Sequence, residues 1–403
     1  MSDSNGSKFF RLDLGRGFFS GILEYGFSVF VILISIRYFN APDSCKAFIA
    51  GGSSLGLIFS PFLVSFWDRY SISKTLLCAF YMLACSIFIF FASFAENVFV
   101  FTFLLVIAQI FLSQIPSLMI RIYTILYKKG ERGFRVSCTL MLSTFGGMAT
   151  SHGLGIYLDA DGADHRMVLW ALSFSALLCS VAHFLMPELK FQMEKSKSSI
   201  NFLSILETPL QDRVFLKILI AWMILGFGVI MTFPLRVEYL ADSKGLNLSN
   251  QEIALIGVSV FLLSKIISSL LWGRLFDHMH FIKFRIILNF LLISSILVYF
   301  NSNEFLGIAI GSALGGFAAG GAQVAWNLWV TKLAPSGKES EYMGLHMALT
   351  GLRGSTAPYF GYLLLKPLGF DGISILSACL VLSASLIFAT THGEKRFTNE
   401  FQN

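Results

Sequence analysis

Long apolar runs separated by short polar connections make up most of the 403-residue chain. A helix needs about 20 apolar residues to cross roughly 30 Å of hydrocarbon. By this measure the pattern predicts an all-α polytopic membrane protein with twelve transmembrane helices. They are expected at residues 17–38, 45–67, 75–95, 98–124, 136–157, 167–186, 214–235, 252–273, 282–300, 305–331, 342–365 and 372–391.

The one long polar connection, residues 187–213, divides the chain near its middle. It separates an expected six-helix half at residues 17–186 from a second at residues 214–391. Polar tails are expected at residues 1–16 and 392–403. The first apolar run is longer than the core of a signal peptide, and no small-residue cleavage pattern follows it. We therefore expect it to be a retained span.

Two pairs of segments indicate that the halves are parallel repeats. FWDRYSISK follows the second span and GRLFDHMHFIK follows the eighth, with Asp68 and Asp277 209 residues apart. TFGGMATSHGLG in the fifth span aligns with TGLRGSTAPYFG in the eleventh at an offset of 206 residues. Near-equal offsets of two independent segments are typical of the repeats from which many secondary transporters are built.

The composition excludes a soluble protein and argues against nucleic-acid binding. Hydrophobic residues make up 55% of the chain and charged residues 13%, about half of the share that is usual in soluble proteins. The net charge of +6 lies in short clusters between apolar runs rather than along one polar face. The six cysteines include no Cys-x-x-Cys pair, so we expect neither a disulfide framework nor a metal site.

The positions of lysine and arginine predict the orientation in the membrane. Of the 30 Lys and Arg residues, about 22 fall on the side of the termini and the central connection. By the positive-inside rule this side, with both termini, is the cytoplasm. Short loops and termini favour a bacterial inner membrane. The residues on the other side are Arg37, Lys46, Arg166, Arg236, Lys244 and Lys366.

The loops after the second and eighth spans resemble the major facilitator superfamily, whose loop motif reads G-x-L-x-D-R-x-G-[RK]-[RK]. Gly273, Leu275 and Asp277 match this motif in the second copy, and Asp68 and Arg69 match it in the first. The resemblance implies a transporter made of two six-helix halves. It further implies that spans 1, 4, 7 and 10 surround a central cavity, and that spans 2, 5, 8 and 11 lie between the halves.

The loop residues Asp68, Arg69, Gly273 and Asp277 are candidates for a cytoplasmic gate. A carboxylate beside a helix N-terminus is stabilised by the positive end of the helix dipole, by about 0.3–1 kcal/mol. In the implied architecture each aspartate lies near the start of a helix of the other half, where it would latch the halves together. The alternative is that the aspartates only keep tight loops soluble.

Three charged residues fall inside apolar spans, namely Glu24, Lys265 and Arg353. A charge at mid-membrane costs about 2.5–3.5 kcal/mol on insertion scales, so such residues are candidates for function. Polar residues at helical spacing accompany them, and these stripes must face protein or water. The candidates for substrate binding or ion coupling are Glu24, Gln109, Arg121, Lys265, Gln323, Trp326, Asn327 and Arg353.

Two interpretations of Glu24 are open. Burial would let it exchange protons near neutral pH and so couple transport to the proton gradient. Alternatively, it forms a permanent ion pair with Lys265 or Arg353. With one acid against two bases, the surplus positive charge favours an anionic or carboxylate-bearing substrate. His152 and His346 are candidates for a proton relay, or each makes a polar contact within the helix bundle.

Neither a phosphate-binding loop G-x-x-x-x-G-K-[ST] nor a catalytic motif such as G-x-S-x-G or H-E-x-x-H occurs. We therefore expect no enzyme and no cofactor, and we expect a gradient to supply the energy. The sequence predicts a secondary active transporter of a small organic solute, functional as a monomer. Its partners would be the lipid bilayer and a proton or another coupling ion. Uptake and export stay open. The alternative is a non-transporting membrane sensor or assembly protein on a transporter scaffold.

Overall fold

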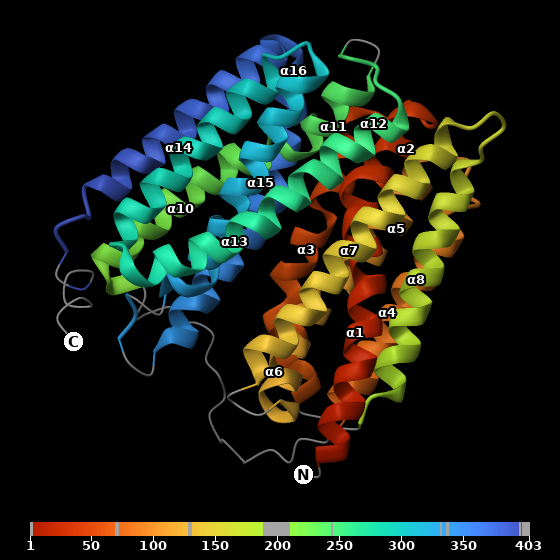
Figure 1. Cartoon of the computed structure of the whole chain (residues 1–403), viewed down its shortest axis with the longest axis horizontal. Helices are drawn as coiled ribbons and strands as arrows, with labels where there is room; N and C mark the ends of the chain where they lie inside the picture. Colours follow the sequence, from red (N-terminus) through yellow and green to blue (C-terminus); the bar gives the residue numbers. More distant parts are fainter. Residues whose placement is uncertain are drawn as a thin grey trace. The chain divides into compact units, whose positions relative to one another are not determined.

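The computed structural model describes residues 3–68, 72–127, 131–187, 210–242, 245–330, 333–335, 338–394 and 396. Helices are the only regular elements in these ranges (Figure 1). Nine segments within them are long and apolar enough to cross a membrane. The prediction of an all-α polytopic membrane protein is confirmed, while the number twelve stays a prediction.

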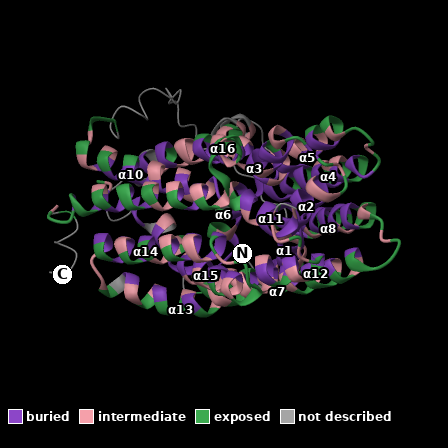
Figure 2. Ribbon diagram, turned by 90° about the horizontal axis from the view of Figure 1, so that it is seen from above, coloured by how far each residue is buried: buried purple, intermediate pink, exposed green. Residues whose placement is uncertain are grey.

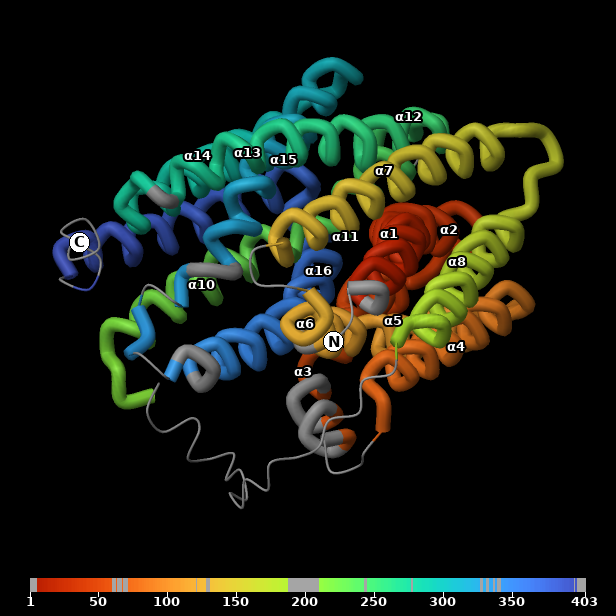
Figure 3. Tube along the Cα trace, turned by 60° about the horizontal axis from the view of Figure 1, so that its bottom comes forward, coloured from red at the N-terminus to blue at the C-terminus, as the bar shows by residue number. Residues whose placement is uncertain are grey.

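The chain forms two compact units, and unit 1 comprises Met1–Ser196 and Leu240–Val258. Its helices are α1 (Asp3–Tyr25), α2 (Ile32–Arg37), α3 (Asp43–Asp68), α4 (Lys74–Ala92), α5 (Val98–Leu112), α6 (Ile115–Leu126), α7 (Arg132–Asp159), α8 (His165–Leu185) and α12 (Asn250–Ala254). Helix α1 packs against α7 and α8 (Figure 3). Helix α5 packs against α3 and α4, and α4 also packs against α8. Helix α1 is thus flanked by two helices that lie far from it in sequence.

The segment Leu240–Val258 is held in unit 1 by two charged side chains. Arg37 Nη1 donates a hydrogen bond to Oδ1 of Asn250 at 2.5 Å. Asp159, at the end of α7, accepts hydrogen bonds at 2.8 Å from the backbone N–H groups of Asn250 and Gln251. These N–H groups lie in the first turn of α12 and have no acceptor within the helix, so the carboxylate accepts their hydrogen bonds and caps the helix.

Unit 2 comprises Lys197–Tyr239 and Ser259–Asn403. Its helices are α10 (Arg213–Ile230), α11 (Phe233–Ala241), α13 (Phe261–His278), α14 (Phe281–Phe300), α15 (Phe305–Leu328) and α16 (Glu339–Ala389). Helix α15 packs against α13 and α14, and α16 packs against α10 and α14. Helix α16 bends at Gly369, whose φ of 66° favours glycine, so its 51 residues comprise two of the predicted spans.

Two π-helical turns join neighbouring helices. The turn η1 (Gly26–Val31) connects α1 to α2, and η2 (Leu255–Val260) connects α12 to α13. Glu24 lies in the last turn of α1, with Tyr25 between it and η1, and Lys265 follows η2 by about one helical turn. Single π-helical turns within α-helices are frequent at functional sites, because they shift the register of the side chains that follow.

Large apolar side chains cover much of the helix surfaces, where exposed and buried residues alternate (Figure 2). Phe134 is 73% exposed and Leu270 is 77% exposed. Such surfaces would be unusual in water, but they suit contact with lipid chains. The exposed side chains thus fit an integral membrane protein.

Helix α1 begins at Asp3, well before residue 17, where the first span was expected to begin. Two charged residues of this stretch are buried rather than part of an exposed tail, since Asp13 has no exposed surface and Arg16 is 8% exposed, whereas Lys8 and Arg11 are exposed. An ion pair between Asp13 and Arg16 offsets part of the cost of burying each charge.

Candidate functional site

A cavity of about 330 Å³ lies inside unit 2, between helices α10, α11, α13, α14, α15 and α16. Its size is at the lower end of the range of small-molecule sites. Aromatic side chains from four of these helices form part of its wall. The lining residues are Trp222, Leu225, Gly226, Val229, Ile230, Phe233, Arg236, Phe261, Lys265, Arg285, Leu292, Gly315, Ala319, Ala322, Gln323, Trp326 and Arg353.

Four cationic side chains line this cavity, namely Arg236, Lys265, Arg285 and Arg353. The described lining residues include no carboxylate. In the part of the chain that the structure describes, none of the three arginines forms an ion pair. Arginine stays protonated in proteins, so at least three of these positive charges are permanent.

Arg285, in α14, is 1% exposed and lies over the indole of Trp222, with its Cζ atom 4.7 Å from the ring centroid. Its Nε donates to Oδ1 of Asn289 at 2.9 Å. Its Nη1 has no hydrogen-bond partner among the described residues. A desolvated cation–π contact contributes about 2 kcal/mol, whereas burying a charge costs several kcal/mol. The site therefore still lacks a counter-charge at Arg285.

Arg353, in α16, is 8% exposed and donates from Nη1 to the backbone carbonyl of Trp222. Its Nε has no partner within the described ranges. Gly226 makes room for this guanidinium, because a Cβ atom at that position would overlap the Cζ of Arg353. Arg285 and Arg353 thus both contact Trp222, one through the ring and the other through the backbone.

The other two cations come from α11 and α13. Arg236 Nη2 donates to Oγ of Ser295 at 3.3 Å, and its Cζ lies 5.1 Å from the ring centroid of Tyr299. Its Nε has no partner in the described part of the chain. Lys265 is half-buried at the wall and contributes a compact ammonium charge.

Further buried polar atoms without partners lie next to the cavity. His346 has no exposed surface, and its ring centroid lies 5.8, 5.6 and 5.2 Å from those of Trp222, Trp326 and Trp329. Both of its ring nitrogens and Nε1 of Trp222 are unpartnered within the described residues. The same holds for the hydroxyl of Thr350, one turn further along α16. An unsatisfied buried polar group typically costs about 1–3 kcal/mol, so this cluster is suited to receive a polar ligand or water.

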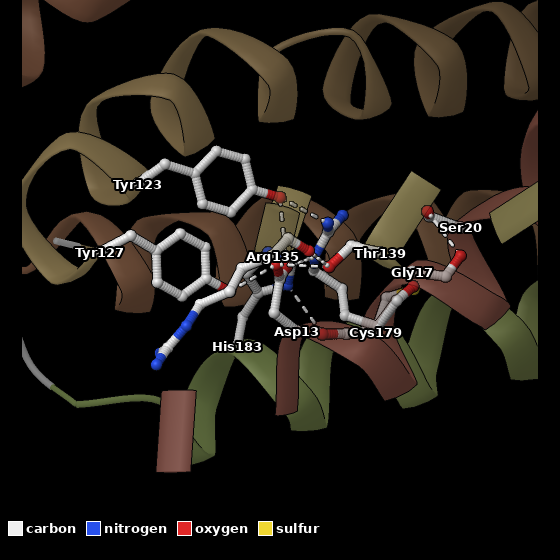
Figure 4. A network of polar contacts seen from close by, with 10 residues as sticks. Asp13, Gly17, Ser20, Tyr123, Tyr127, Arg135, Thr139, Cys179 and His183 are labelled. Atoms are coloured by element: carbon white, nitrogen blue, oxygen red, sulfur yellow. Dashed lines mark hydrogen bonds and ion pairs between the residues drawn. The ribbon is translucent and has the colours of Figure 1, made fainter. Parts of the chain in front are cut away.

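A different polar cluster lies in unit 1, where Asp13 accepts four hydrogen bonds (Figure 4). Arg16 Nε donates to it at 2.8 Å, and the hydroxyls of Tyr123, Tyr127 and Thr139 donate at 3.2, 3.0 and 2.9 Å. Arg16 also donates from Nη2 to Tyr123 at 2.9 Å. In this cluster each charge has its partner inside the protein.

The family model described as Major Facilitator Superfamily matches residues 17–250 and 237–403. The chain belongs to the major facilitator superfamily. The predicted family is therefore confirmed, and it indicates a transporter rather than an enzyme. Proteins of this superfamily bind small-molecule substrates within the lipid bilayer and often couple to ions.

Solved structures of transporters share the fold at low sequence identity. A mutant of the nucleoside transporter NupG has a TM-score of 0.80 at 10% identity, over 96% of this chain and 99% of that one. A bacterial homolog of the human lysosomal transporter Spinster has a TM-score of 0.73 at 12% identity, over 99% of each chain. The xylose transporter XylE from E. coli has a TM-score of 0.68 at 13% identity, over 94% of each chain. Comparison with the curated proteins gives no match.

In this superfamily chain, four of the predicted site residues line one cavity: Lys265, Gln323, Trp326 and Arg353. The side chain of Asn327 lies outside the described residues. The sequence does not single out Arg285, and it places Arg236 among the charges on the side of the membrane opposite the termini. The structure places both on the cavity wall.

The predicted residues of unit 1 do not gather at one site. Gln109 is 3% exposed, and its amide bridges Ser53 and the backbone carbonyl of Ile49 at 3.0 and 2.8 Å. Glu24, in α1, and His152, in α7, are exposed. Gln109 thus joins α3 to α5, which is a packing contact within the unit.

Most side chains of the predicted gate lie outside the described part of the chain. Arg69 lies outside it altogether, and the side chains of Asp68 and Asp277 are not described. The side chain of Arg121, a candidate for substrate binding or coupling, is not described either. Gly273 is half-buried in α13. Within the described residues, no group of three or more His, Cys, Asp or Glu could hold a metal ion.

Proposed function

We propose that this protein is a secondary active transporter of a small organic anion, which binds in the cavity of unit 2. The observation that carries this proposal is the set of four cationic side chains on a wall whose described residues include no carboxylate. A buried charge is costly unless an opposite charge or hydrogen bonds compensate it. An anionic solute would supply the missing negative charge.

The rest of the wall supports an organic rather than an inorganic anion. Trp222, Phe233, Phe261 and Trp326 give the cavity large apolar surfaces, and Gln323 adds one amide. Pockets of this kind bind the body of a ligand through apolar contacts and orient it through a few polar groups. The transported solute would thus have an anionic group and a compact apolar or aromatic body.

Coupling to protons is the second element of the proposal. Glu24 would take up and release the coupling proton, and its place in the last turn of α1, next to the π-helical turn η1, supports a functional role. His346 would relay protons, which its buried and unpartnered nitrogens among the described residues support.

The transport cycle would be alternating access between two six-helix halves, residues 17–186 and 214–391. The distribution of lysine and arginine supports cytoplasmic termini, and short loops support a bacterial inner membrane. The protein would act as a monomer. The proposed cytoplasmic gate comprises Asp68, Arg69, Gly273 and Asp277.

The test is the melting temperature of the detergent-purified protein with organic anions, sugars, amino acids and lipophilic cations. A ligand that prefers the folded state stabilises it by about 2.7 kcal/mol at 100 times its Kd. We expect an organic anion to raise the melting temperature, and counterflow of that anion in proteoliposomes. A rise in the melting temperature with neutral or cationic solutes alone would contradict the proposal that the substrate is an anion. Binding without counterflow would instead support a non-transporting sensor.

A variant pair tests the coupling. Glu24→Gln removes the proposed proton site, and Glu96→Gln makes the same change at an exposed position between α4 and α5. We expect the dependence of uptake on pH, measured with saturating solute at about pH 6 and pH 8, to disappear in Glu24→Gln and to persist in Glu96→Gln. Equal pH profiles of the two variants would remove Glu24 from the coupling mechanism.

A further inference from the structure

The wall of the cavity also indicates which kind of anion fits. We propose that the anionic group is a doubly charged tetrahedral oxyanion of the phosphate-monoester class, bound between Arg285 and Arg353. This inference rests on the organic-anion function proposed above and narrows its substrate class.

The charge of the two arginines favours a dianion. Arg285 lies over the ring of Trp222, and Arg353 donates to the backbone carbonyl of the same residue, so both guanidinium groups contact one residue of the cavity wall. Both are buried and permanently charged. A singly charged group would compensate only one of them, whereas a phosphate monoester has a charge of about −1.5 to −2 at neutral pH.

The number of unused donors favours a tetrahedral group. Arg285 Nη1, Arg353 Nε and the indole nitrogen of Trp222 are buried donors without partners among the described residues. A phosphate monoester offers three strong acceptor oxygens, one for each of these donors. A carboxylate offers two. The planar fork of arginine also matches phosphate geometry, so the two arginines would fix the orientation of the group.

The surrounding field favours the ionised form of the ligand. Lys265 and Arg236 place two more positive charges on the same wall. Nearby positive charge favours the ionised form of an acid, so it would keep a bound phosphate group in its dianionic form. The aromatic part of the wall remains for the organic body of the ester.

Four probes with the same aromatic ring separate charge from shape: phenyl phosphate, phenyl sulfate, benzoate and isophthalate. Phenyl sulfate is tetrahedral with one charge, and isophthalate has two charges on planar groups. With full-length protein at pH 7.5, we expect phenyl phosphate to bind at least about 10-fold more tightly than the other three. From pH 7.5 to 5.5 its affinity should fall about fourfold as the dianion is lost, because the second pKa of such esters is about 6. The affinity of phenyl sulfate should not change.

Two variants test the location. Gly226→Ala displaces the guanidinium of Arg353 without removing a charge, and Gly344→Ala, in the same helix as Arg353, is the control because its Cβ meets no atom within 4 Å. We expect Gly226→Ala to weaken phenyl phosphate binding by about 10-fold, the loss of one charge-assisted hydrogen bond. Arg353→Lys, which retains the charge but loses the fork, should cause a similar loss.

Each outcome separates the two proposals. Tighter binding of isophthalate or benzoate overturns the phosphate class and leaves the organic-anion function in place. Binding of neutral or cationic solutes alone overturns both. Equal affinities of Gly226→Ala and Gly344→Ala overturn the assigned location. If phenyl phosphate does not bind at about 10 mM, its Kd is too weak for a specific site, and the inference is overturned.

Discussion

Units 1 and 2 both bury arginine in helices that are apolar enough for a membrane, but they compensate its charge in different ways. Arg16 of unit 1 forms an ion pair with Asp13, and three hydroxyls complete the coordination of that carboxylate. Arg285 and Arg353 of unit 2 have an aromatic ring, an amide oxygen and a carbonyl instead. The first cluster is complete without a ligand, and the second has unused donors.

This difference teaches how a structural charge can be told from a binding charge. In a cluster whose charges are all compensated, such as that of Asp13, removing one partner leaves a buried charge without compensation, so the substitution should destabilise the protein. Removing one cation from a group of like charges relieves repulsion, so that substitution should not destabilise it. We therefore expect substitutions in the cluster of unit 1 to lower the stability of the protein. Substitutions of the cavity arginines in unit 2 should weaken ligand binding without lowering stability.

The largest effect is expected for Asp13→Asn. The substitution leaves Arg16 buried without a carboxylate, which typically costs about 3–5 kcal/mol. Chemical denaturation of the detergent-purified protein measures this loss. Asp161→Asn makes the same change at an exposed position and should alter stability by less than about 0.5 kcal/mol. Equal stabilities of the two variants would show that the carboxylate of Asp13 does not compensate the buried charge of Arg16.

Asp159→Asn tests a carboxylate of unit 1 that is compensated by backbone N–H groups. Its hydrogen bonds to Asn250 and Gln251 act as a cap of α12, and a lost cap typically costs about 1 kcal/mol. We expect faster hydrogen exchange in residues 250–254, with no change in α4. Unchanged exchange in α12 would mean that Asn250 and Ser249 hold this segment without the charge.

Arg285→Met and Arg16→Met should change the free energy of unfolding in opposite directions. We expect the free energy of unfolding to rise by about 1 kcal/mol in Arg285→Met, because the substitution removes a buried cation that has no counter-charge among the described residues. Arg16→Met should lower it, because Asp13 loses its ion pair. Arg274→Met, at an exposed position in α13, is the control. Destabilisation by Arg285→Met of more than about 2 kcal/mol would make that arginine a structural residue.

The smallest effect concerns an ion pair of unit 2 outside the cavity. Arg396 Nη1 donates to Oδ2 of Asp212 at 2.6 Å, at the start of α10. Burial opposes ionisation of Asp212, but hydrogen bonds from Arg396 and from the backbone N–H of Phe215 outweigh it, so its pKa is lowered from 3.8. A lowered pKa stabilises the folded state above the ordinary pKa, and this contribution is lost as the pH falls through the folded value.

We therefore expect Arg396→Gln to lower stability by less than about 1 kcal/mol at pH 7, because the arginine is partly exposed. The difference from the wild type should shrink as the pH falls through the lowered pKa of Asp212, because protonation of this carboxylate removes the ion pair. Melting curves recorded from pH 7 into the acid range measure it. A difference that persists at the lower pH would show that Arg396 acts through packing rather than through this pair.

Much of the fold could be predicted from the sequence, because a membrane span has to be apolar along its whole length. Lys265 and Arg353 were found for the same reason, since a charge in the middle of an apolar run stands out. Trp326 and Gln323 followed from helical spacing. The predicted spans at residues 45–67 and 136–157 correspond to α3 and α7. Both are helical, but among the described residues neither is apolar enough to count as a candidate membrane span.

Arg236 and Arg285 could not be found in this way, because each lies near the end of an apolar run, where basic residues usually face the membrane boundary. Arg236 lies in α11, after the break at Met231 and Thr232 that ends α10, and it lines the cavity from there. In unit 1, the spacing of Asp13 and Arg16 is compatible with a helical ion pair. Their hydroxyl partners lie more than 100 residues away in sequence, so only the tertiary structure reveals them.

The close approach of α13 and α15 also limits how the specificity of this protein can be altered. A Cβ atom at Gly316 would overlap the carbonyl oxygen of Phe261, so this face of α15 does not tolerate a larger residue. On the neighbouring face, Ala319 and Ala322 line the cavity with small side chains. Larger side chains at Ala319 and Ala322 would therefore narrow the cavity for smaller solutes, whereas Gly316 cannot be enlarged without moving α13.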